Sequence, residues 1–213
     1  MITLYGNGQS RSFRALWALE EIKIPYIYKH VNLGIGTHAP CDDFLLLNSQ
    51  GKVPILTDDD LVITESAAIL NYIAALKPSS CLIPKDNPSL RAKYDEICFF
   101  ALSELEQPLW TSGKHRFALP EEVRVLDILD TVHWEFDMAI KALGYLMKGK
   151  MFAIGDQFTM ADILVAHTLH WAEDFMFDVP DEFQTYWKSM YERPACKKAL
   201  NIISRKTNNY KTK

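Results

Sequence analysis

The chain has 213 residues, of which 48% are apolar and 23% are charged, as expected of a globular protein with one or two domains. The formal net charge is −4 at pH 7 and the pI is near 5.9. This acidic balance argues against a broad phosphate-binding surface, and so against a nucleic-acid partner. No apolar run approaches the roughly 20 residues of a membrane span, so no membrane partner is expected. The N-terminal residues lack the features of a signal peptide, and a cytoplasmic location is expected.

The chain shows no metal-binding pattern. Its four cysteines are far apart, and no pair has the spacing of a zinc finger or a redox motif. Its six histidines form no HxxxH or HxH pair. We therefore expect reduced thiols and no metal.

The first third of the chain predicts a small α/β domain that begins in the order β-α-β. Apolar residues at helical spacing, Ala15 to Ile22, predict a helix that Pro25 ends. Strands are predicted on either side of it, at residues 2–5 and 26–33, and a short helix at 42–48.

Two further β-rich runs, VPILT and LVIT, are separated by Asp58, Asp59 and Asp60, which predicts an antiparallel hairpin. Apolar spacing from Ile69 to Leu76 predicts the next helix. The order βαβ-ββα is that of a thioredoxin-like sheet, with one parallel and one antiparallel half.

A segment rich in proline and serine follows, and helical spacing dominates after it. We therefore predict a thioredoxin-like domain at 1–77, a linker at 78–87 and an all-helical domain of about five helices at 88–213. Asn87-Pro88 predicts a helix cap, Pro108 a kink or an end, and Pro120 the start of another helix. A helix is expected around Phe183–Met190, and Pro194 is expected to begin the last one.

The stretch LYGNGQSRSFRALWALEE places a polar turn before a helix, with Arg14 one turn after Ser10. Ser10 either caps this helix or donates a hydrogen bond to a bound anion. A donor at a helix N-terminus lowers the pKa of a thiol, which is near 8.5 when free. Because no cysteine lies close in the sequence, a ligand would have to supply that thiol.

Two other stretches have both a structural and a functional interpretation. Val53-Pro54 can be an ordinary trans proline at a strand start, or the cis proline of a thioredoxin-like fold, whose preceding residue pairs with an extended peptide. Thr64-Glu65-Ser66 can cap a helix, or its N–H groups and the Ser66 hydroxyl can hold a carboxylate while Glu65 pairs with an ammonium. A ligand with a thiol, a peptide backbone and both charged groups is glutathione.

These stretches give the chain a resemblance to the cytosolic glutathione S-transferases, especially their serine-type bacterial and theta-like branches. The matching segments span nearly the whole chain in the family's order: LYGNGQSRSFRALWALEE, NSQGKVPIL, LVITESAAILNYIA, FAIGDQFTMADI and ERPACKKAL. The resemblance implies the two-domain fold of that family, glutathione as co-substrate, no metal, and commonly a homodimer.

By position, the resemblance implies that Ser10 stabilises the thiolate, with Ser12 and Tyr5 as alternatives. Glutathione would be held by Lys52, Val53, Pro54, Glu65 and Ser66, with His38 as a further candidate. The pocket for the electrophile would comprise Asn7, Gly8, Phe99 and Trp110. The segment Thr159–Asp162 matches the capping box at the start of the family's buried helix, to which we assign a folding role.

The chain departs from the family pattern at Asn48-Ser49, where Asn-Pro is common, and at the acidic hairpin turn. The Ser10-Arg11-Ser12 turn holds no cysteine, which disfavours the isomerase and redox branches. The sequence thus predicts a glutathione transferase acting on a largely apolar electrophile. Two alternatives remain open: a non-catalytic binding or scaffold protein of the same fold, and a glutathione-dependent peroxidase or dehalogenase.

Overall fold

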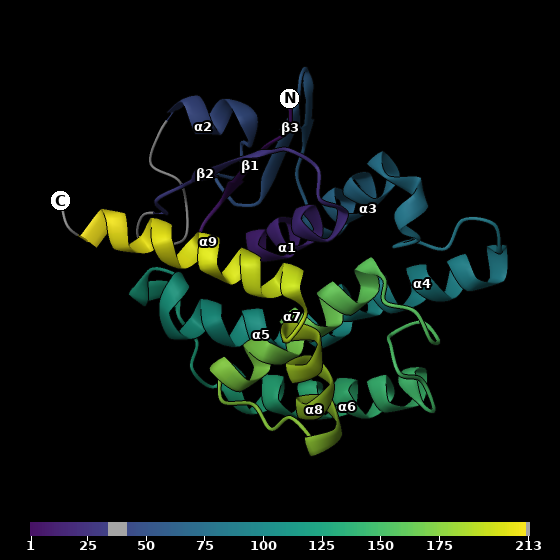
Figure 1. Ribbon diagram of the computed structural model, residues 1–213. Helices are drawn as coiled ribbons and strands as arrows, with labels where there is room; N and C mark the ends of the chain where they lie inside the picture. The colour runs from purple at the N-terminus through teal and green to yellow at the C-terminus, as the bar shows by residue number, and fades with distance from the viewer. Residues whose placement is uncertain (34–41, 212–213) are drawn as a thin grey trace. The chain divides into compact units, whose positions relative to one another are not determined.

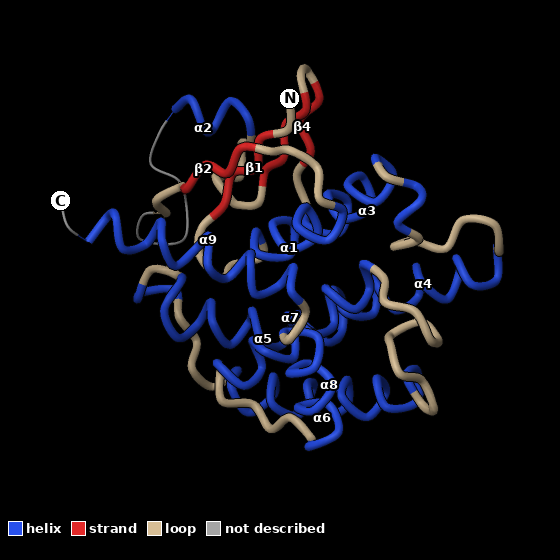
Figure 2. Tube along the Cα trace, viewed as in Figure 1, coloured by secondary structure: helices blue, strands red, loops and turns tan. Residues whose placement is uncertain are grey.

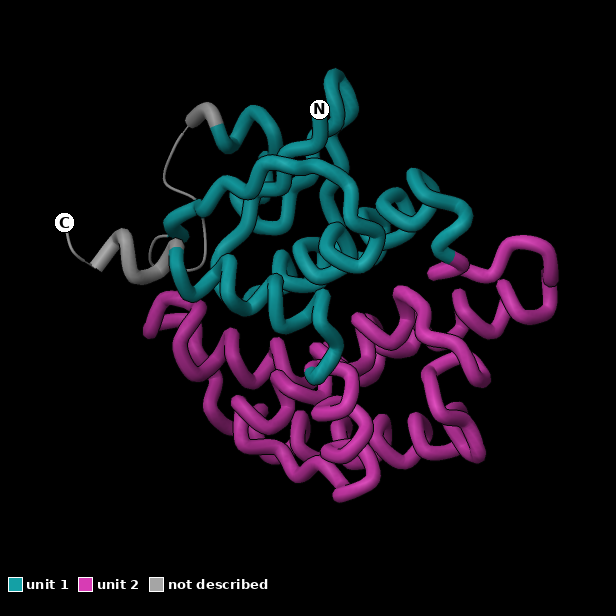
Figure 3. Tube along the Cα trace, viewed as in Figure 1, with its two compact units in different colours: residues 1–80, 192–213 teal, residues 81–191 magenta. Residues whose placement is uncertain are grey.

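The computed structural model describes residues 1–33 and 42–211, and the side chains of 1–33 and 44–205. The chain forms two compact units (Figure 3). Unit 1 comprises residues 1–80 and 192–213, and unit 2 comprises residues 81–191. No helix among the described residues is long and apolar enough to cross a membrane.

Unit 1 contains a four-stranded mixed sheet in the order β2-β1-β3-β4 (Figure 2). Strand β1 (Thr3–Gly6) pairs in parallel with β2 (Ile27–His30) and antiparallel with β3 (Ile55–Asp58). Strands β3 and β4 (Leu61–Ile63) form the hairpin, in whose turn Asp59 adopts a positive φ of 49°. The predicted thioredoxin-like sheet is confirmed.

Three helices follow the predicted pattern in unit 1 (Figure 1): α1 (Ser12–Ile22), α2 (Asp42–Leu47) and α3 (Ser66–Leu76). A short 3₁₀ turn, Pro78–Ser80, closes this part of the chain. Helix α1 is buried over most of its length, with Phe13, Leu16 and Trp17 fully buried. It ends at Ile22, three residues before Pro25, because the next residue, Lys23, takes the left-handed conformation that terminates helices.

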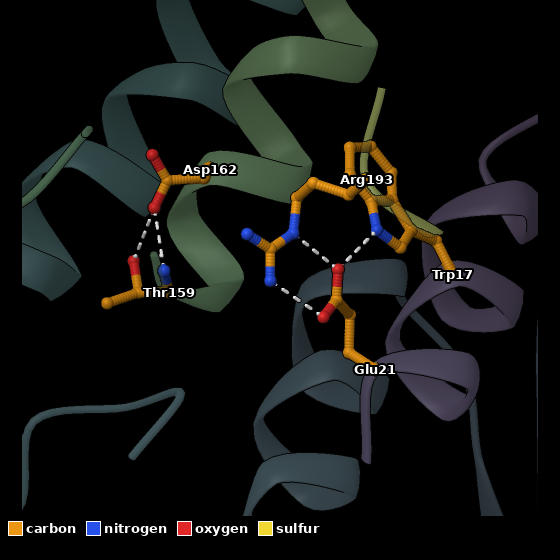
Figure 4. Close-up of polar contacts among 5 residues, drawn as sticks. All are labelled: Trp17, Glu21, Thr159, Asp162 and Arg193. Carbon is orange, nitrogen blue, oxygen red and sulfur yellow. Dashed lines mark hydrogen bonds and ion pairs between the residues drawn. The ribbon is translucent and has the colours of Figure 1, made fainter. Parts of the chain in front are cut away.

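Helix α9 (Pro194–Lys211) begins at Pro194 as predicted, and it belongs to unit 1. The sequence-based boundary placed this helix with the second domain, whereas the structure groups it with the first 80 residues. An ion pair joins the two segments: Arg193 Nε and Nη2 donate to the Glu21 carboxylate at 2.6 and 2.9 Å (Figure 4). Glu21 also accepts from the Trp17 indole at 2.9 Å, so one α1 side chain holds the start of α9.

Unit 2 is helical, and its described α-helices are α4 (Pro88–Phe100), α5 (Glu106–Gly113), α6 (Ile128–Met147), α7 (Met160–Asp174) and α8 (Asp181–Tyr191). The predicted cap of α4 is confirmed, because the Asn87 side chain accepts the backbone N–H of Leu90 at 3.0 Å.

The two prolines of unit 2 differ in their effect. Pro108 lies inside α5, and a π-helical turn, Ala101–Leu105, precedes it and changes the backbone hydrogen bonding there, so the helical path does not end at this proline. The prediction for Pro120 was wrong. Pro120 begins only a 3₁₀ turn, Glu121–Val123. Arg124 is then extended, and the long helix begins at Ile128.

The predicted capping box at the start of α7 is confirmed (Figure 4). Asp162 is fully buried and accepts the backbone N–H and hydroxyl of Thr159 at 2.7 and 3.0 Å. It also accepts the Ala153 N–H and the Tyr186 hydroxyl, both at 2.7 Å. Burial raises the pKa of the Asp162 carboxyl, and these four donors oppose that rise. One carboxylate therefore joins α7, α8 and the preceding loop.

Candidate functional site

The strand register brings two of the predicted stretches together at one edge of the sheet. Tyr5, near the end of β1, pairs with Ile55 at the start of β3. The chain leaves β1 toward the turn that contains Ser10 and enters β3 directly from Pro54. The Ser10 turn and the Val53-Pro54 peptide are therefore neighbours by topology, although some 40 residues separate them.

The turn after β1 brings Ser10 and Ser12 into contact. Their Oγ atoms lie 2.8 Å apart, and Ser12 Oγ accepts the backbone N–H of Asn7 at 2.9 Å. Ser12 is 1% exposed, whereas Ser10 is half-buried. Ser10 Oγ also lies 3.3 Å from the Ser12 N–H, so the capping interpretation of Ser10 holds in part. Of the two serines, only Ser10 has exposed surface that a ligand could contact.

The Val53-Pro54 peptide bond is cis, as expected for a thioredoxin-like fold. The loop before it is held by Asn48, which is 9% exposed. The Asn48 amide donates to the Lys52 carbonyl at 2.9 Å, and its oxygen accepts the Gln50 N–H at 3.0 Å. The Lys52 ammonium donates to the Gln50 side chain at 3.2 Å. Sequence reasoning treated Asn48 only as a departure from a pattern and missed this role.

At the start of α3, Glu65 is exposed and has φ 65° and ψ 116°. Such a backbone is strained for a residue other than glycine, and it is common at ligand sites. The next residue, Ser66, is 3% exposed, and its hydroxyl lies 3.2 Å from Nη1 of Arg14. Arg14 is fully buried in α1, so a buried cation links the helix after Ser10 to the Glu65-Ser66 stretch. Sequence reasoning noted the position of Arg14 but assigned it no contact.

Of the remaining candidates, two lie in unit 1, two lie in unit 2 and one lies outside the described residues. Tyr5 packs its ring against Phe44, and its hydroxyl lies 3.4 Å from the Lys29 ammonium. Gly8 has φ 47°, and a Cβ at this position would meet no atom within 4 Å. Phe99, on α4, is 68% exposed, and Trp110, on α5, is half-buried; both lie in unit 2, whereas Tyr5 and Gly8 lie in unit 1. His38 lies outside the described residues.

Comparison with known proteins identifies the family of the chain. Residues 1–75 match the model for the N-terminal domain of glutathione S-transferases, and residues 119–194 match the C-terminal domain. Glutathione S-transferase GstB of Escherichia coli strain K12 is 32% identical over 95% of this chain and 99% of its own length. The chain belongs to the glutathione S-transferase family.

Solved structures of the glutathione S-transferase family support the same assignment. A glutathione transferase from Methylococcus capsulatus superposes with a TM-score of 0.84 at 25% identity, over 96% of this chain and 99% of the other. A sphingomonad glutathione S-transferase complexed with glutathione gives a TM-score of 0.82 at 25% identity, over 95% and 98% of the two chains.

Proposed function

We propose that the protein is a glutathione transferase that ionises the thiol of bound glutathione and directs it at a small, largely apolar electrophile. The observation that carries the proposal is the arrangement of unit 1. The β1–β3 register brings Ser10 and the cis Val53-Pro54 peptide to one sheet edge, and Arg14 ties the Ser10 helix to Ser66. Membership of the glutathione S-transferase family supports the choice of ligand.

Each part of glutathione has a proposed partner in unit 1. The Val53 backbone pairs with the cysteinyl unit, as an added strand would. Ser66 and the N–H groups at the start of α3 hold the γ-glutamyl carboxylate, while Glu65 pairs with the adjacent ammonium. Lys52 meets the glycine carboxylate, and His38 is a further candidate for that contact.

Ser10 donates its O–H to the sulfur, and the N-terminus of α1 adds a favourable field for a negative charge, so the thiol releases its proton to solvent water and remains as a thiolate. The thiolate then uses a lone pair to form the S–C bond, and the leaving group departs with its bonding electrons. The enzyme contributes an ionised nucleophile and its orientation, and no metal takes part in the proposed step. Within unit 1, Asn7 and Gly8 are the proposed contacts of the electrophile, and Phe99 and Trp110 stay predictions from the sequence.

Two measurements test this function. We expect retention on immobilised glutathione, and an absorbance change when an aryl halide with a chromogenic conjugate is added with glutathione. Binding without turnover, over a panel that includes hydroperoxides and haloalkanes, would favour the non-catalytic alternative. Turnover of hydroperoxides or haloalkanes alone would favour the peroxidase or dehalogenase. Absence of glutathione binding in calorimetry would refute the proposal.

We also propose that the protein is a cytoplasmic homodimer. Light scattering measures the mass in solution and so tests the dimer.

The buried contact between Arg14 and Ser66 leads to a second prediction. Arg14→Met removes a charged donor to Ser66 while keeping much of the side-chain volume. We expect Arg14 to orient the Ser66 hydroxyl for its proposed bond to the γ-glutamyl carboxylate. Because a hydrogen bond to a charged group contributes about 1.5–3 kcal/mol, loss of that bond is expected to raise the Kd for glutathione about 10- to 100-fold. Calorimetry measures this change, and the double variant with Ser66→Ala measures the coupling between the two residues.

The control for Arg14→Met is Lys23→Met, which removes an exposed cation at the end of the same helix. Lys23→Met is expected to leave the Kd unchanged. Cysteinylglycine lacks the γ-glutamyl group, so Arg14→Met is expected to weaken its binding little. An equal loss for both ligands would show that Arg14 does not act through Ser66.

A further inference from the structure

The chain has two serine hydroxyls in contact at the proposed thiol site, where the mechanism needs one donor. Ser10 Oγ and Ser12 Oγ are 2.8 Å apart, in the turn that joins β1 to α1. Ser12 is 1% exposed and therefore has almost no surface to offer a ligand. The role of Ser12 at this site therefore differs from that of Ser10, and assigning it rests on the proposed function, in which Ser10 donates to the sulfur.

The hydrogen bonds around the pair indicate where each proton lies. Ser12 Oγ accepts the Asn7 N–H at 2.9 Å, so its own proton must go elsewhere. The Asn7 carbonyl lies 3.5 Å from it, beyond the usual 2.5–3.0 Å of an O–H···O bond, whereas Ser10 Oγ lies at 2.8 Å. Donation from Ser12 to Ser10 is therefore the better arrangement.

In that arrangement the Ser10 oxygen uses both of its acceptor sites on Ser12. One receives the Ser12 hydroxyl at 2.8 Å, and the other faces the Ser12 backbone N–H at 3.3 Å. A serine hydroxyl has two lone pairs and one proton. The proton of Ser10 then points away from Ser12 and is available to an acceptor outside the pair.

The turn holds this geometry in place. The Asn7 side-chain amide donates to the Val31 carbonyl at 2.7 Å, which fixes the residue whose N–H orients Ser12. Gly6 allows Ser12 to pack against the end of β1, since a Cβ at residue 6 would lie 2.7 Å from Ser12 Oγ. Ser12 thus occupies a fixed position between the strand and Ser10.

We propose that Ser12 is a positioning residue for thiol ionisation: its O–H donates to Ser10 Oγ and directs the Ser10 proton to the glutathione sulfur. Hydrogen bonds in a chain polarise one another, so the bond from Ser12 also makes Ser10 a stronger donor. Ser12 does not touch the substrate. No proton is gained or lost in this step, because only the direction of two existing O–H bonds is set.

The test is the pKa of enzyme-bound glutathione, measured from its ultraviolet thiolate band as a function of pH. Ser12→Ala is expected to raise this pKa by up to about one unit, a tenfold change in the thiolate-to-thiol ratio. The Kd for glutathione is expected to stay close to the wild-type value. Ser10→Ala is expected to raise the pKa further, and the double variant is expected to match Ser10→Ala alone, because Ser12 acts only through Ser10.

A matched control is Ser112→Ala. Ser112 is also fully buried, and within the described part of the chain its Oγ has no hydrogen-bond partner. Its removal is expected to leave the thiol pKa unchanged, so a shift in Ser12→Ala alone is not a general effect of losing a buried hydroxyl.

The possible outcomes separate the inference from the function on which it rests. A wild-type thiol pKa in Ser12→Ala, beside a raised one in Ser10→Ala, overturns the inference and leaves the proposed function standing. Additive shifts in the double variant also overturn it, because Ser12 would then act independently of Ser10. A wild-type protein with no thiolate band overturns the proposed function and this inference together. A raised pKa in Ser12→Ala that adds nothing to Ser10→Ala supports both.

Discussion

Ser10→Ala is expected to lower the rate of glutathione conjugation at pH 6.5–7 by about 100-fold, with glutathione binding largely retained. The physical reason is the loss of the half-buried Ser10 hydroxyl, which we propose as the donor to the sulfur. If its pKa rises by about two units, the bound thiol changes from mostly ionised to mostly protonated at neutral pH. Stopped-flow kinetics with an aryl halide and the ultraviolet thiolate band measure the two effects.

The deficit of Ser10→Ala depends on pH in a predictable direction. A thiol is ionised above its pKa, and a free thiol has a pKa near 8.5. The wild type is expected to keep its thiolate at neutral pH, whereas Ser10→Ala is expected to gain it only as the pH rises toward about 9. The ratio of wild-type to variant kcat/KM is therefore expected to fall with increasing pH. A constant ratio from pH 6 to 9 would mean that Ser10 does not act on thiol ionisation.

The two alternatives for the donor predict different patterns of loss. Tyr5→Phe removes the hydroxyl near the Lys29 ammonium, and we expect the thiolate band to persist in this variant. Loss of the band in Tyr5→Phe, with the band intact in Ser10→Ala, would transfer the role to Tyr5. Ser12, at 1% exposure, is too buried to reach the sulfur directly, so an effect of Ser12→Ala is expected only through Ser10.

Much of the fold was predictable because local signals and tertiary structure agree in this chain. The apolar stripe from Ala15 to Ile22 predicts only the helix that contains it, and Asn87-Pro88 predicts only the helix start that it caps. Both predictions are confirmed. The helix assigned to Pro120 failed because proline at a first turn permits a helix without requiring one, and Arg124 is extended. The place of α9 was not predictable, because an ion pair between Glu21 and Arg193 leaves no local pattern.

The candidate site shows the same limit. Residue type and order identified the candidates Ser10, Val53-Pro54 and Glu65-Ser66. Each of these stretches lies at the start of a helix or a strand, and the neighbouring residues indicate that start. Two contacts were not foreseen: the bond from buried Arg14 to Ser66, and the Asn48 amide that holds the Lys52 carbonyl. Both join segments through side-chain orientation, which sequence spacing does not specify. An Asn three residues before Gly51, which has φ 64°, was the available signal for the Asn48 turn.

The largest effect on stability is expected for Asp162→Ala. This change leaves the Thr159 N–H and hydroxyl, the Ala153 N–H and the Tyr186 hydroxyl without their acceptor. An unsatisfied buried donor costs about 1–3 kcal/mol, so four of them are expected to lower the free energy of unfolding by about 4 kcal/mol or more. Urea unfolding followed by circular dichroism measures the loss, and an unchanged slope would show that the native fold persists.

The control for Asp162→Ala is Asp156→Ala, which removes an exposed carboxylate from the loop just before α7. This change is expected to alter the unfolding free energy by less than about 0.5 kcal/mol. Asp162→Asn keeps one acceptor oxygen but places an amide against donors, so its loss is expected to lie between the two. A loss below about 1 kcal/mol for Asp162→Ala would mean that water satisfies these donors. Since α7 and α8 meet at this carboxylate, the destabilisation is expected to begin in unit 2.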